Sequence, residues 1–253
     1  MTIEAHGLEI RIGARLLLAP TDFTVSKGDR IGLVGRNGAG KTTLTRVITG
    51  EALPSSGTVR TTGKLGYLPQ DTHAADQGQS ALDRIMSARN ISSIISRLRK
   101  AENDMTDPAL MEKAMRRYDT AMQDFENAGG YAAQSDAIVM AESLGIPQDI
   151  LKNPLGNLSG GQRRRIELAR ILFSDADTLI LDEPTNHLDA DSIEWLQKYL
   201  ASYDKGLLVI SHSTELLGET VNKIWHLDAL TAHIDMYSMG WQAYLHQRAV
   251  DEE

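Results

Sequence analysis

The spacing of apolar residues divides the chain into a strand-rich beginning, a helical middle and an alternating last third. The first part has short apolar runs bounded by glycine and polar turn residues, which predict strands. These strands are expected at 8–12, 22–25, 31–34 and 58–68, with a turn at 51–57. After the third strand, apolar residues recur at helical intervals over 42–48, so this segment reads as strand, loop and helix.

The middle of the chain, from about residue 80 to 145, has apolar spacings of three and four, which predict helical hairpins interrupted at Gly129 and Gly130. The last third alternates between helices and strands, which is the pattern of parallel βα units. Helices are expected at 160–173 and 190–199, and strands at 178–181 and 207–210. A terminal hairpin, 223–227 with 233–237, and a helix from 241 complete the pattern.

Composition excludes several kinds of protein. The 253 residues include no cysteine, which removes thiol nucleophiles, cysteine zinc sites and disulfide frameworks. The N-terminus lacks the basic and apolar run of a signal peptide, and no segment approaches the roughly 20 apolar residues of a membrane span. We therefore expect a globular, cytoplasmic protein that does not insert into a membrane.

The charge is acidic overall but uneven along the chain. A formal charge of −8 argues against indiscriminate nucleic-acid binding. Residues 84–100 nevertheless contain no acidic residue and several basic ones: Arg84, Arg89, Arg97, Arg99 and Lys100. Such a stretch is either the solvated face of a helix or a local contact for nucleic-acid phosphates.

A phosphate-binding loop is the strongest chemical motif. The sequence GRNGAGKT, Gly35 to Thr42, fits G-x-x-x-x-G-K-[ST] and lies between a predicted strand and a predicted helix, as that motif requires. Its glycines allow backbone N–H groups to converge on a phosphate, and the helix N-terminus adds its positive dipole end. Lys41 is expected to reach the β- and γ-phosphates, and the Thr42 hydroxyl to bind Mg²⁺. The plainer alternative is a glycine-rich turn with a solvated lysine.

Two carboxylates follow the strand predicted at 178–181. Asp182 and Glu183 lie at its carboxyl end, where open α/β sheets bind ligands. We expect Asp182 to hold Mg²⁺ and Glu183 to polarise an attacking water as general base. The alternative is an acidic turn that only caps the next helix.

A third motif, LSGGQRRR at 158–165, places Ser159 and two glycines at a helix start. Ser159 suits an N-cap, and the exposed N–H groups beside it suit a phosphate, so capping and anion binding both stay open. The arginines that follow are expected to form a solvated face.

Together these motifs resemble those of the ATP-binding cassette (ABC) ATPases. GRNGAGKT, Gln70, LSGGQ, LDEP and Ser211-His212 occur in that family's order and span nearly the whole chain. The resemblance implies an α/β fold, namely an ABC-type P-loop nucleotide-binding domain with an antiparallel β subdomain and an inserted helical subdomain that contains an arm. It also implies ATP and Mg²⁺ as ligands and ATP hydrolysis as the activity.

The resemblance assigns roles to individual residues. Catalysis is expected from Glu183, His212 and Gln70, and Mg²⁺ binding from Thr42, Gln70 and Asp182. Nucleotide contacts are expected from Gly35, Arg36, Asn37, Gly38, Ala39, Gly40, Lys41, Thr42, Thr43, Ile12 and Arg15. Ile12 stands where many cassettes carry an aromatic residue that stacks on adenine, so base recognition is expected to be weaker or to come from apolar contact and Arg15.

The resemblance also implies that sites are shared. In the family, ATP sites form between two cassettes, one of which provides the phosphate loop and the other LSGGQ. Ser159, Gly160, Gly161 and Gln162 are therefore expected to act on a nucleotide held by another cassette, and Asp189 to touch that partner. The chain would carry two half sites, remain mostly monomeric alone and hydrolyse ATP slowly.

Within the family, the chain resembles the first cassette of the F subfamily, which are soluble tandem ATPases acting on ribosomes. The features are Asn186-His187-Leu188-Asp189 after DEPT, the long insert and the ending GWQAYLHQRAVDEE. We expect a core with its β subdomain at 1–79, a helical subdomain with the arm at 80–157, the rest of the core at 158–240 and the start of a linker helix at 241–253. The chain would then be part of a longer protein, with a natural single-cassette protein as the alternative.

The resemblance implies two partners, and other functions remain open. A second cassette in the same full-length chain and the ribosome, through rRNA or tRNA, are the expected partners, with the basic stretch 84–100 inside the insert. One alternative is the energy subunit of a membrane transporter. Another is a binding module that does not hydrolyse ATP.

Overall fold

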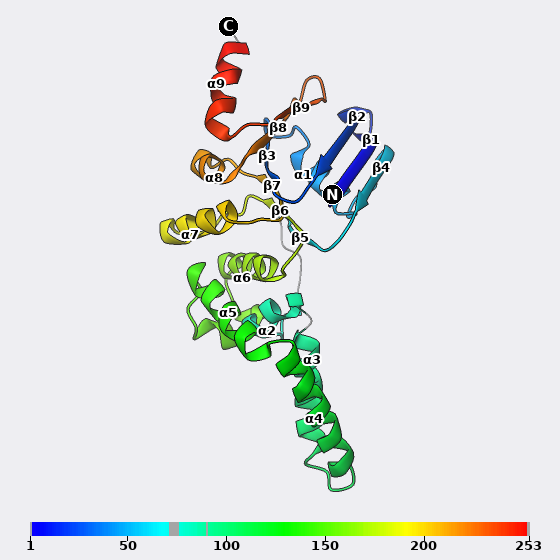
Figure 1. Ribbon diagram of the computed structural model, residues 1–253, viewed down its shortest axis with the longest axis vertical. Coiled ribbons are helices and arrows are strands. Elements are labelled where there is room, and N and C mark those ends of the chain that lie inside the picture. The colour runs from blue at the N-terminus through cyan, green and yellow to red at the C-terminus, as the bar shows by residue number, and fades with distance from the viewer. Residues whose placement is uncertain (1, 71–75, 90, 252–253) are drawn as a thin grey trace. The chain divides into compact units, whose positions relative to one another are not determined.

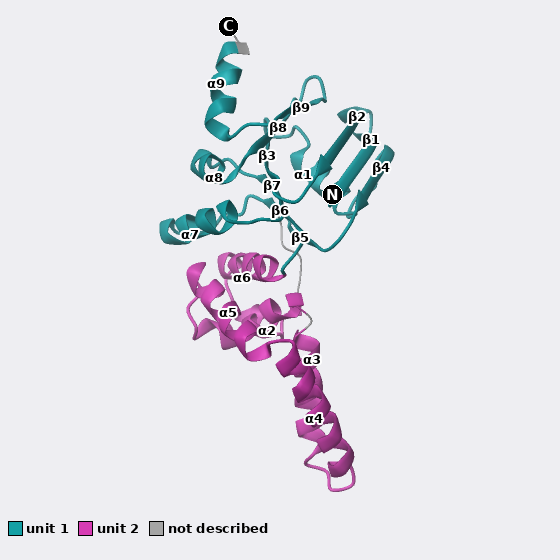
Figure 2. Cartoon of the chain, in the orientation of Figure 1, with its two compact units in different colours: residues 1–72, 175–253 teal, residues 73–174 magenta. Residues whose placement is uncertain are grey.

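The computed structural model of the chain describes residues 2–70, 76–89 and 91–251 (Figure 1). They form two compact units, which Figure 2 colours separately. The first, here called the core unit, comprises 1–72 and 175–253, and the second, the helical unit, comprises 73–174. No helix among the described residues combines the length and the apolar character needed to cross a membrane.

The strands of the core unit form two sheets. The smaller sheet is antiparallel, has the order β2-β1-β4, and consists of β1 (Ile3–Ile12), β2 (Arg15–Val25) and β4 (Ser56–Thr61). The larger has the order β5-β6-β7-β3-β8-β9 and consists of β3 (Arg30–Val34), β5 (Leu65–Leu68), β6 (Thr178–Asp182), β7 (Gly206–Ile210), β8 (Lys223–Leu227) and β9 (Ile234–Tyr237). Its neighbouring strands are parallel except for the β8–β9 hairpin. The predicted α/β fold with an antiparallel β subdomain is confirmed.

Among the described residues, four helices belong to the core unit, and two of them begin with a local side-chain cap. They are α1 (Lys41–Ile48), α7 (Ala190–Ala201), α8 (Thr214–Thr220) and α9 (Trp241–Asp251). Asp189 caps α7 by accepting the Ser192 N–H at 2.9 Å, and Ser213 caps α8 by accepting the Leu216 N–H at 3.2 Å. Strands β6 and β7 are buried along their whole length, as expected for central strands of a parallel sheet.

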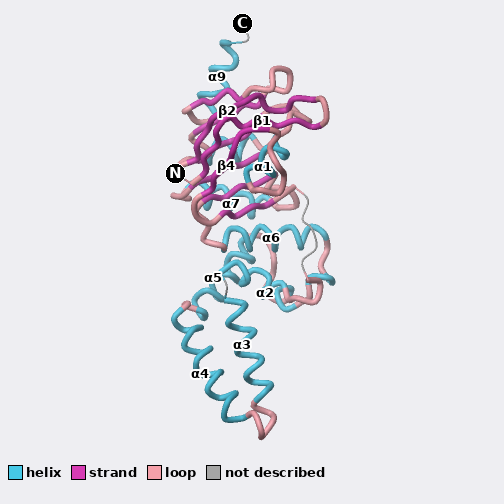
Figure 3. The backbone as a smooth tube through the Cα atoms, turned by 90° about the vertical axis from the view of Figure 1, so that its right-hand side faces the viewer, coloured by secondary structure: helices cyan, strands magenta, loops and turns pink. Residues whose placement is uncertain are grey.

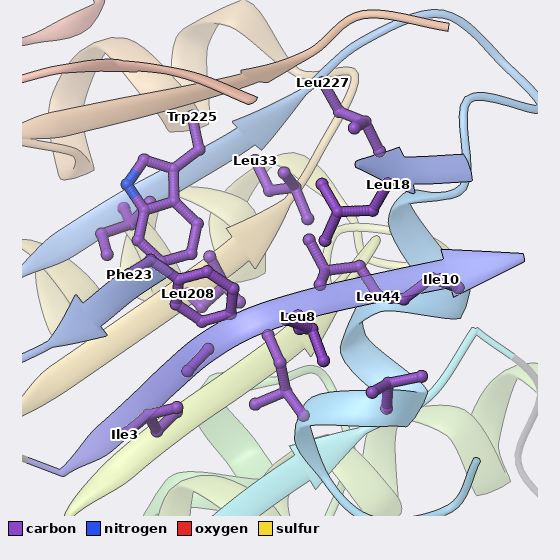
Figure 4. Close-up of a cluster of buried hydrophobic side chains, with 14 of the residues drawn as sticks. Ile3, Leu8, Ile10, Leu18, Phe23, Leu33, Leu44, Leu208, Trp225 and Leu227 are labelled. Carbon is purple, nitrogen blue, oxygen red and sulfur yellow. The ribbon is translucent and has the colours of Figure 1, made fainter. Parts of the chain in front are cut away.

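A hydrophobic core joins the two sheets and α1 within the core unit (Figure 4). Leu8 and Phe23 contribute from the antiparallel sheet, Leu44 from α1, and Leu208 and Trp225 from the larger sheet. The rings of Phe23 and Trp225 lie 4.8 Å apart between centroids. This packing fixes α1, and with it the loop before α1, against the carboxyl ends of the strands.

Three predictions for the first part of the chain differ from the structure. The run expected as one strand at 58–68 is divided between β4 and β5, which belong to different sheets. The chain turns between them at Gly63, whose φ of +85° favours glycine, and a Cβ there would lie 2.4 Å from the Asp177 carboxylate. The turn expected at 51–57 ends earlier, because β4 already begins at Ser56. Strands β1 and β2 are also longer than predicted. Polar residues alternate with buried ones in much of β1, and three consecutive buried residues lie near the start of β2.

The helical unit consists of helices in its described part (Figure 3). They are α2 (Ala81–Met86), α3 (Ile91–Asp104), α4 (Met111–Asn127), α5 (Gly130–Ser143) and α6 (Gly160–Phe173), with short 3₁₀ helices η1 (Ser87–Arg89), η2 (Ile150–Lys152) and η3 (Leu155–Asn157). Helices α3 and α4 pack side by side as a hairpin (Figures 1 and 3). The predicted break lies at Gly129, with φ +66°, before α5. Helix α6 packs on α2 and α5 and so belongs to this unit.

Most of the basic residues in 84–100 have partners inside the helical unit. Arg84 pairs with Glu167 at 2.6 Å, Arg97 with Asp124 at 2.8 Å and Arg99 with Asp83 at 3.2 Å. Arg89 donates to the Phe173 carbonyl at 2.5 Å and lies over the Phe173 ring. The stretch is therefore largely part of the packing of this unit. The expected solvated face on α6 is also wrong in part, because Arg164 is 6% exposed.

Glu167 links α2 and α6 by accepting from two arginines. Arg84 and Arg170 donate to its two oxygens at 2.6 and 2.9 Å, and its side chain is 12% exposed. Burial favours the neutral carboxyl, but the hydrogen bonds and charges of the two arginines outweigh it and lower the Glu167 pKa. The ionised carboxylate therefore contributes stability at neutral pH.

We expect Glu167→Ala to lower the free energy of unfolding by about 2–3 kcal/mol, because two partly buried arginines lose their partner. Urea unfolding followed by circular dichroism measures this change. The pKa of Glu167 is lowered in the folded chain, so its ionised carboxylate stabilises the fold. The difference in unfolding free energy between wild type and Glu167→Gln should therefore be largest above the ordinary carboxylate pKa and shrink as pH falls through the lowered pKa. The control is Glu142→Ala, an exposed glutamate on α5; equal losses in both variants would contradict the assignment.

Candidate nucleotide-binding site

A cavity of about 630 Å³ lies in the core unit at the carboxyl ends of β3, β6 and β7. This volume is within the range of small-molecule sites. Its lining residues are Ile12, Arg15, Leu17, Asn37, Gly38, Gly40, Lys41, Thr42, Thr43, Gln70, Asp182, Glu183, Asn186, Ile210 and His212. The phosphate-loop motif and the two strand-end carboxylates, far apart in the sequence, therefore meet in one cavity.

Lys41 is held inside the loop that precedes it. Its Nζ donates to the Gly35 carbonyl at 2.8 Å and the Arg36 carbonyl at 3.1 Å, and the residue is 9% exposed. Burial lowers the Lys41 pKa, although the carboxylates of Glu183 and Asp182 favour the charged form. The plainer alternative of a solvated lysine is thus wrong, because the side chain is buried and its ammonium donates to two loop carbonyls.

Thr42 and Asp182 form a pair of oxygen ligands. The Thr42 hydroxyl donates to Asp182 Oδ2 at 2.7 Å, and Asp182 is 1% exposed. Mg²⁺ prefers oxygen ligands and is usually bound by one or two carboxylates together with substrate phosphates and water. No group of three or more His, Cys, Asp or Glu suited to a metal occurs among the described residues. A hydroxyl and a carboxylate beside a phosphate loop fit such a phosphate-assisted magnesium site.

Glu183 occupies an unusual backbone conformation at the end of β6. Its φ is +49°, its N–H donates to the Ile210 carbonyl at 2.9 Å, and it is 9% exposed. The His212 N–H donates to Oε2 at 3.3 Å, and His212 Nε2 lies 3.4 Å from Oε1. Oε1 is buried and accepts no hydrogen bond from the described residues. Burial raises the Glu183 pKa, against the opposing effect of His212. Strain and burial of this kind concentrate at functional sites.

The other predicted nucleotide contacts fall into three groups. Gln70 and Thr43 line the cavity, and so do Ile12 and Arg15 from the β1–β2 hairpin. Ala39 is buried in the hydrophobic core. Gly35 and Arg36 line a separate cavity of about 500 Å³ beside α9, and their contribution to the nucleotide cavity is the pair of carbonyls that hold Lys41.

The signature motif lies in the helical unit and forms a helix cap. Ser159 Oγ accepts the Gln162 N–H at 3.2 Å, and Gln162 Oε1 accepts the Ser159 N–H at 2.9 Å. This reciprocal capping box begins α6 and leaves Gly160 exposed at its first turn. Capping is thus observed, and anion binding by the same helix start stays a prediction.

Sequence reasoning missed some cavity residues. Leu17, Asn186 and Ile210 line the cavity, and none of them was assigned a role there. Asn186 lies three residues after Glu183 in a stretch already noted as distinctive, so proximity to Asp182 and Glu183 was an available signal. Leu17 and Ile210 carry no such signal, because apolar residues in strands are usually core.

Comparison with known proteins decides the family. Residues 18–186 match the family model described as "ABC transporter". The chain belongs to the ABC transporter family. This ABC cassette is 33% identical over its whole length to the putative ATP-binding protein YdiF of Bacillus subtilis, covering 40% of that protein. It is 31% identical over 98% of its length to the tylosin resistance ATP-binding protein TlrC of Streptomyces fradiae, covering 46% of that protein. The cassette thus spans less than half of these two relatives.

The fold of the cassette is shared with solved structures. A structure titled as the ATP binding subunit of an ABC transporter matches it with a TM-score of 0.69, at 16% identity, over 94% of this chain and 90% of that one. The predicted ABC-type fold is confirmed. Membership of this family implies that the cassette binds ATP and that ATP hydrolysis is the general activity of such domains.

Proposed function

We propose that this cassette is the ATP-driven switch of a ribosome-associated protein of the F-subfamily type, acting as one of two paired cassettes. A relative named for resistance to tylosin supports this proposal. The observation that carries it is a basic cavity along the α3–α4 hairpin, which lies between the phosphate loop and the signature motif in the sequence. Its volume is about 480 Å³, and its lining residues are Arg97, Lys100, Ala101, Lys113, Arg116, Arg117 and Thr120.

The nucleotide cavity supports hydrolysis by a simple division of roles. When a triphosphate enters, the Lys41 ammonium exchanges the Gly35 and Arg36 carbonyls for phosphate oxygens, which are stronger acceptors. The Thr42 and Asp182 oxygens would hold Mg²⁺, which would neutralise part of the phosphate charge. Glu183 Oε1 is a buried acceptor that receives no hydrogen bond from the part of the chain that the structure describes, and it is placed to orient a water and take its proton. Gln70 and His212 complete the phosphate end of the cavity.

Pairing completes the site in this proposal. Ser159, Gly160, Gly161 and Gln162 present the exposed start of α6 to a nucleotide held by another cassette, and Asp189 lies in the loop that meets it. Anion binding suits that helix start because its N–H groups and dipole favour negative charge. ATP bound between two cassettes would then bias their closed arrangement, and hydrolysis would release it.

The basic cavity of the hairpin has the chemistry of a phosphate-backbone contact. Its basic residues are three positions apart on α3 and three and four positions apart on α4, so each helix presents them on one face. Arg97 and Arg117 are held by Asp124 and Asp104 in pairs whose arginines are 53% and 42% exposed. Exposed pairs contribute about 0–1 kcal/mol, so these arginines can exchange their carboxylates for RNA phosphates at little cost. Lys100 and Lys113 add charge between them.

We expect the double variant Lys100→Glu, Lys113→Glu to weaken co-sedimentation with bacterial ribosomes by about tenfold or more. The dependence of log affinity on log salt should also become shallower by about two, because each lysine removed would have neutralised one phosphate. The matched control is Lys27→Glu, Lys198→Glu, which reverses two exposed lysines of the core unit. Equal binding by wild type and the hairpin variant would remove the basic cavity from the ribosome contact.

A second candidate function, the energy subunit of a membrane transporter, is favoured by a different cavity. It occupies about 410 Å³ in the helical unit, and its lining includes Leu82, Met86, Leu98 and Phe125. A mainly apolar groove between helices suits the apolar face of an amphipathic helix, such as one from a membrane subunit. Co-sedimentation with membrane vesicles from the source organism, and none with ribosomes, would favour this function.

A further inference from the structure

A second cavity of the core unit lies against the first residues of the phosphate loop. Its volume is about 500 Å³, and Val34, Gly35 and Arg36 line it. Later residues of the loop, from Asn37 on, line the nucleotide cavity, and the two cavities have no lining residue in common. The loop therefore borders two separate spaces, and the chemistry of ATP accounts for only one of them.

Helix α9 forms another wall of this cavity, and packing between rings holds its aromatic residues in place. Trp241 and Tyr244 line the cavity, are 9% and 5% exposed, and have ring centroids 5.4 Å apart. Tyr237 of β9 packs its ring edge-on against Tyr244 at 5.2 Å, and Leu245 adds an aliphatic side chain to the lining. The wall is therefore apolar, aromatic and already formed, as in sites that bind small molecules.

The loop side of the cavity is fixed as well. Gly35 has a φ of +150°, and a Cβ there would lie 2.4 Å from the Leu227 carbonyl oxygen, so the loop backbone packs directly on the end of β8. The Gly35 and Arg36 carbonyls also accept hydrogen bonds from Lys41. Because both walls are held by contacts of their own, a ligand would enter at a small cost in ordering.

Arg36 supplies the cavity with a cation that nothing else uses. Its side chain is exposed and makes no hydrogen bond or ion pair with any residue that the structure describes. Arg248 also lines the cavity, whereas no Asp or Glu of the described chain does so, and the Asp235 carboxylate, 3.9 Å from His226 Nδ1, lies outside the lining. The charge of the lining therefore favours an anion, and a guanidinium matches a planar carboxylate through two parallel N–H groups.

We propose that this cavity is a second ligand site of the cassette and that its ligand is a small aromatic carboxylate. The ring of the ligand rests on Trp241 and Tyr244, and its carboxylate pairs with Arg36. An uncharged aromatic molecule would leave the guanidinium unused, and an aliphatic acid would leave the rings uncovered, so tight binding requires both parts. The site is independent of the ribosome role proposed above, because it uses neither the α3–α4 hairpin nor the signature motif.

Isothermal titration calorimetry with indole-3-acetate tests the chemistry of the site on this chain. We expect a dissociation constant below about 1 mM. Indole-3-acetamide, which lacks the charge, and acetate, which lacks the ring, should each bind at least about tenfold more weakly. A dissociation constant of indole-3-acetate above about 1 mM, or equal affinities of the acid and its amide, would overturn the proposal.

Mg-ATP separates this cavity from the nucleotide cavity. As the concentration of Mg-ATP is raised, the apparent dissociation constant of indole-3-acetate should reach a constant value, because both ligands can be bound at once. An increase in proportion to the concentration of Mg-ATP would place the carboxylate in the nucleotide cavity instead. That result would overturn the proposal and leave nucleotide binding standing.

A negative charge placed in the lining tests the position of the site. Leu245 is 42% exposed, so Leu245→Glu should fold, and it should weaken binding of indole-3-acetate by about tenfold or more through repulsion. The matched control is Val250→Glu, which places the same charge on α9 at a side chain that is 56% exposed and outside the lining, and it should leave binding unchanged. Arg36→Gln should weaken binding by about as much as Leu245→Glu, because the carboxylate loses its partner. Unchanged affinity in both cavity variants, shown to be folded by circular dichroism, would overturn the proposal.

Discussion

Replacing Glu183 by glutamine is expected to lower the single-turnover rate of ATP hydrolysis by about a hundredfold or more while ATP binding is retained. Glu183 is 9% exposed, its carboxylate accepts the His212 N–H, and its other oxygen is buried and accepts no hydrogen bond from the described residues. Glutamine preserves the shape but cannot take a proton from water. The assay uses radiolabelled ATP with the chain in excess and concentrated, because a complete site is expected to require two cassettes.

Two controls separate catalysis from folding. Glu194→Gln neutralises a paired glutamate on the exposed face of α7 and should leave the rate unchanged. Because burial raises the Glu183 pKa, the fold disfavours its carboxylate, so Glu183→Gln should unfold at an equal or higher temperature at neutral pH. Lowering the pH protonates Glu183 and should lower the wild-type rate. Because its pKa is raised, this loss should begin at a higher pH than it would for a glutamate of ordinary pKa. Unchanged turnover in Glu183→Gln would favour a binding module that does not hydrolyse ATP.

The order of elements was predictable because each depends on local periodicity. The apolar run at 178–181 is bounded by polar residues and becomes β6, and the mixed spacing at 160–173 becomes α6. The assignment of strands to sheets was not predictable in this way. Nothing local in 58–68 shows that β4 pairs with β1 and β5 with β6, because both partners are distant in the sequence. Between the two strands, the Lys64 N–H donates to Asp177, over one hundred residues away.

Short helices and charge pairs were the other failures. Helix α8 was missed because seven residues give too little periodicity, although Ser213 is a recognisable cap. The basic stretch 84–100 contains no acidic residue, so its sequence gives no sign that Asp83, Asp124 and Glu167 pair with its arginines. Asp83 directly precedes the stretch, whereas Asp124 and Glu167 come from α4 and α6. The pattern of charges along a chain therefore shows where basic residues are concentrated, and only the fold shows which of them face solvent.

The candidate site was largely predictable because its motifs are short and dense. Lys41, Asp182 and Glu183 were named from sequence, and the structure places all three around one cavity. The hydrogen bond between Thr42 and Asp182 joins residues 140 positions apart, so sequence could name both residues but not their contact. Leu17 and Ile210 were missed because a wall of a cavity and a face of a core have the same apolar pattern.

Replacing Lys41 by alanine is expected to weaken Mg-ATP binding by about 10- to 150-fold, which corresponds to about 1.5–3 kcal/mol for the lost hydrogen bonds to a charged group. Isothermal titration calorimetry measures the change. In the free cassette the ammonium is satisfied by the Gly35 and Arg36 carbonyls, so it is already directed into the loop when phosphate arrives. Burial lowers the Lys41 pKa, so Lys41 should lose its proton at a lower pH than an exposed lysine does. The affinity of the wild type for Mg-ATP should therefore decline as pH rises through that lower range, and the alanine variant should lack this decline.

Two further variants distinguish a phosphate contact from a structural role of Lys41. Lys27→Ala removes a lysine that is 74% exposed and should leave binding unchanged. Lys41→Arg keeps the charge, but its planar fork is larger than the ammonium that fits between two carbonyls in a residue only 9% exposed, so it should not restore binding. Full affinity in Lys41→Ala would show that the two carbonyls, and not a phosphate, are the principal partners of this side chain. Its burial would then stabilise the loop alone.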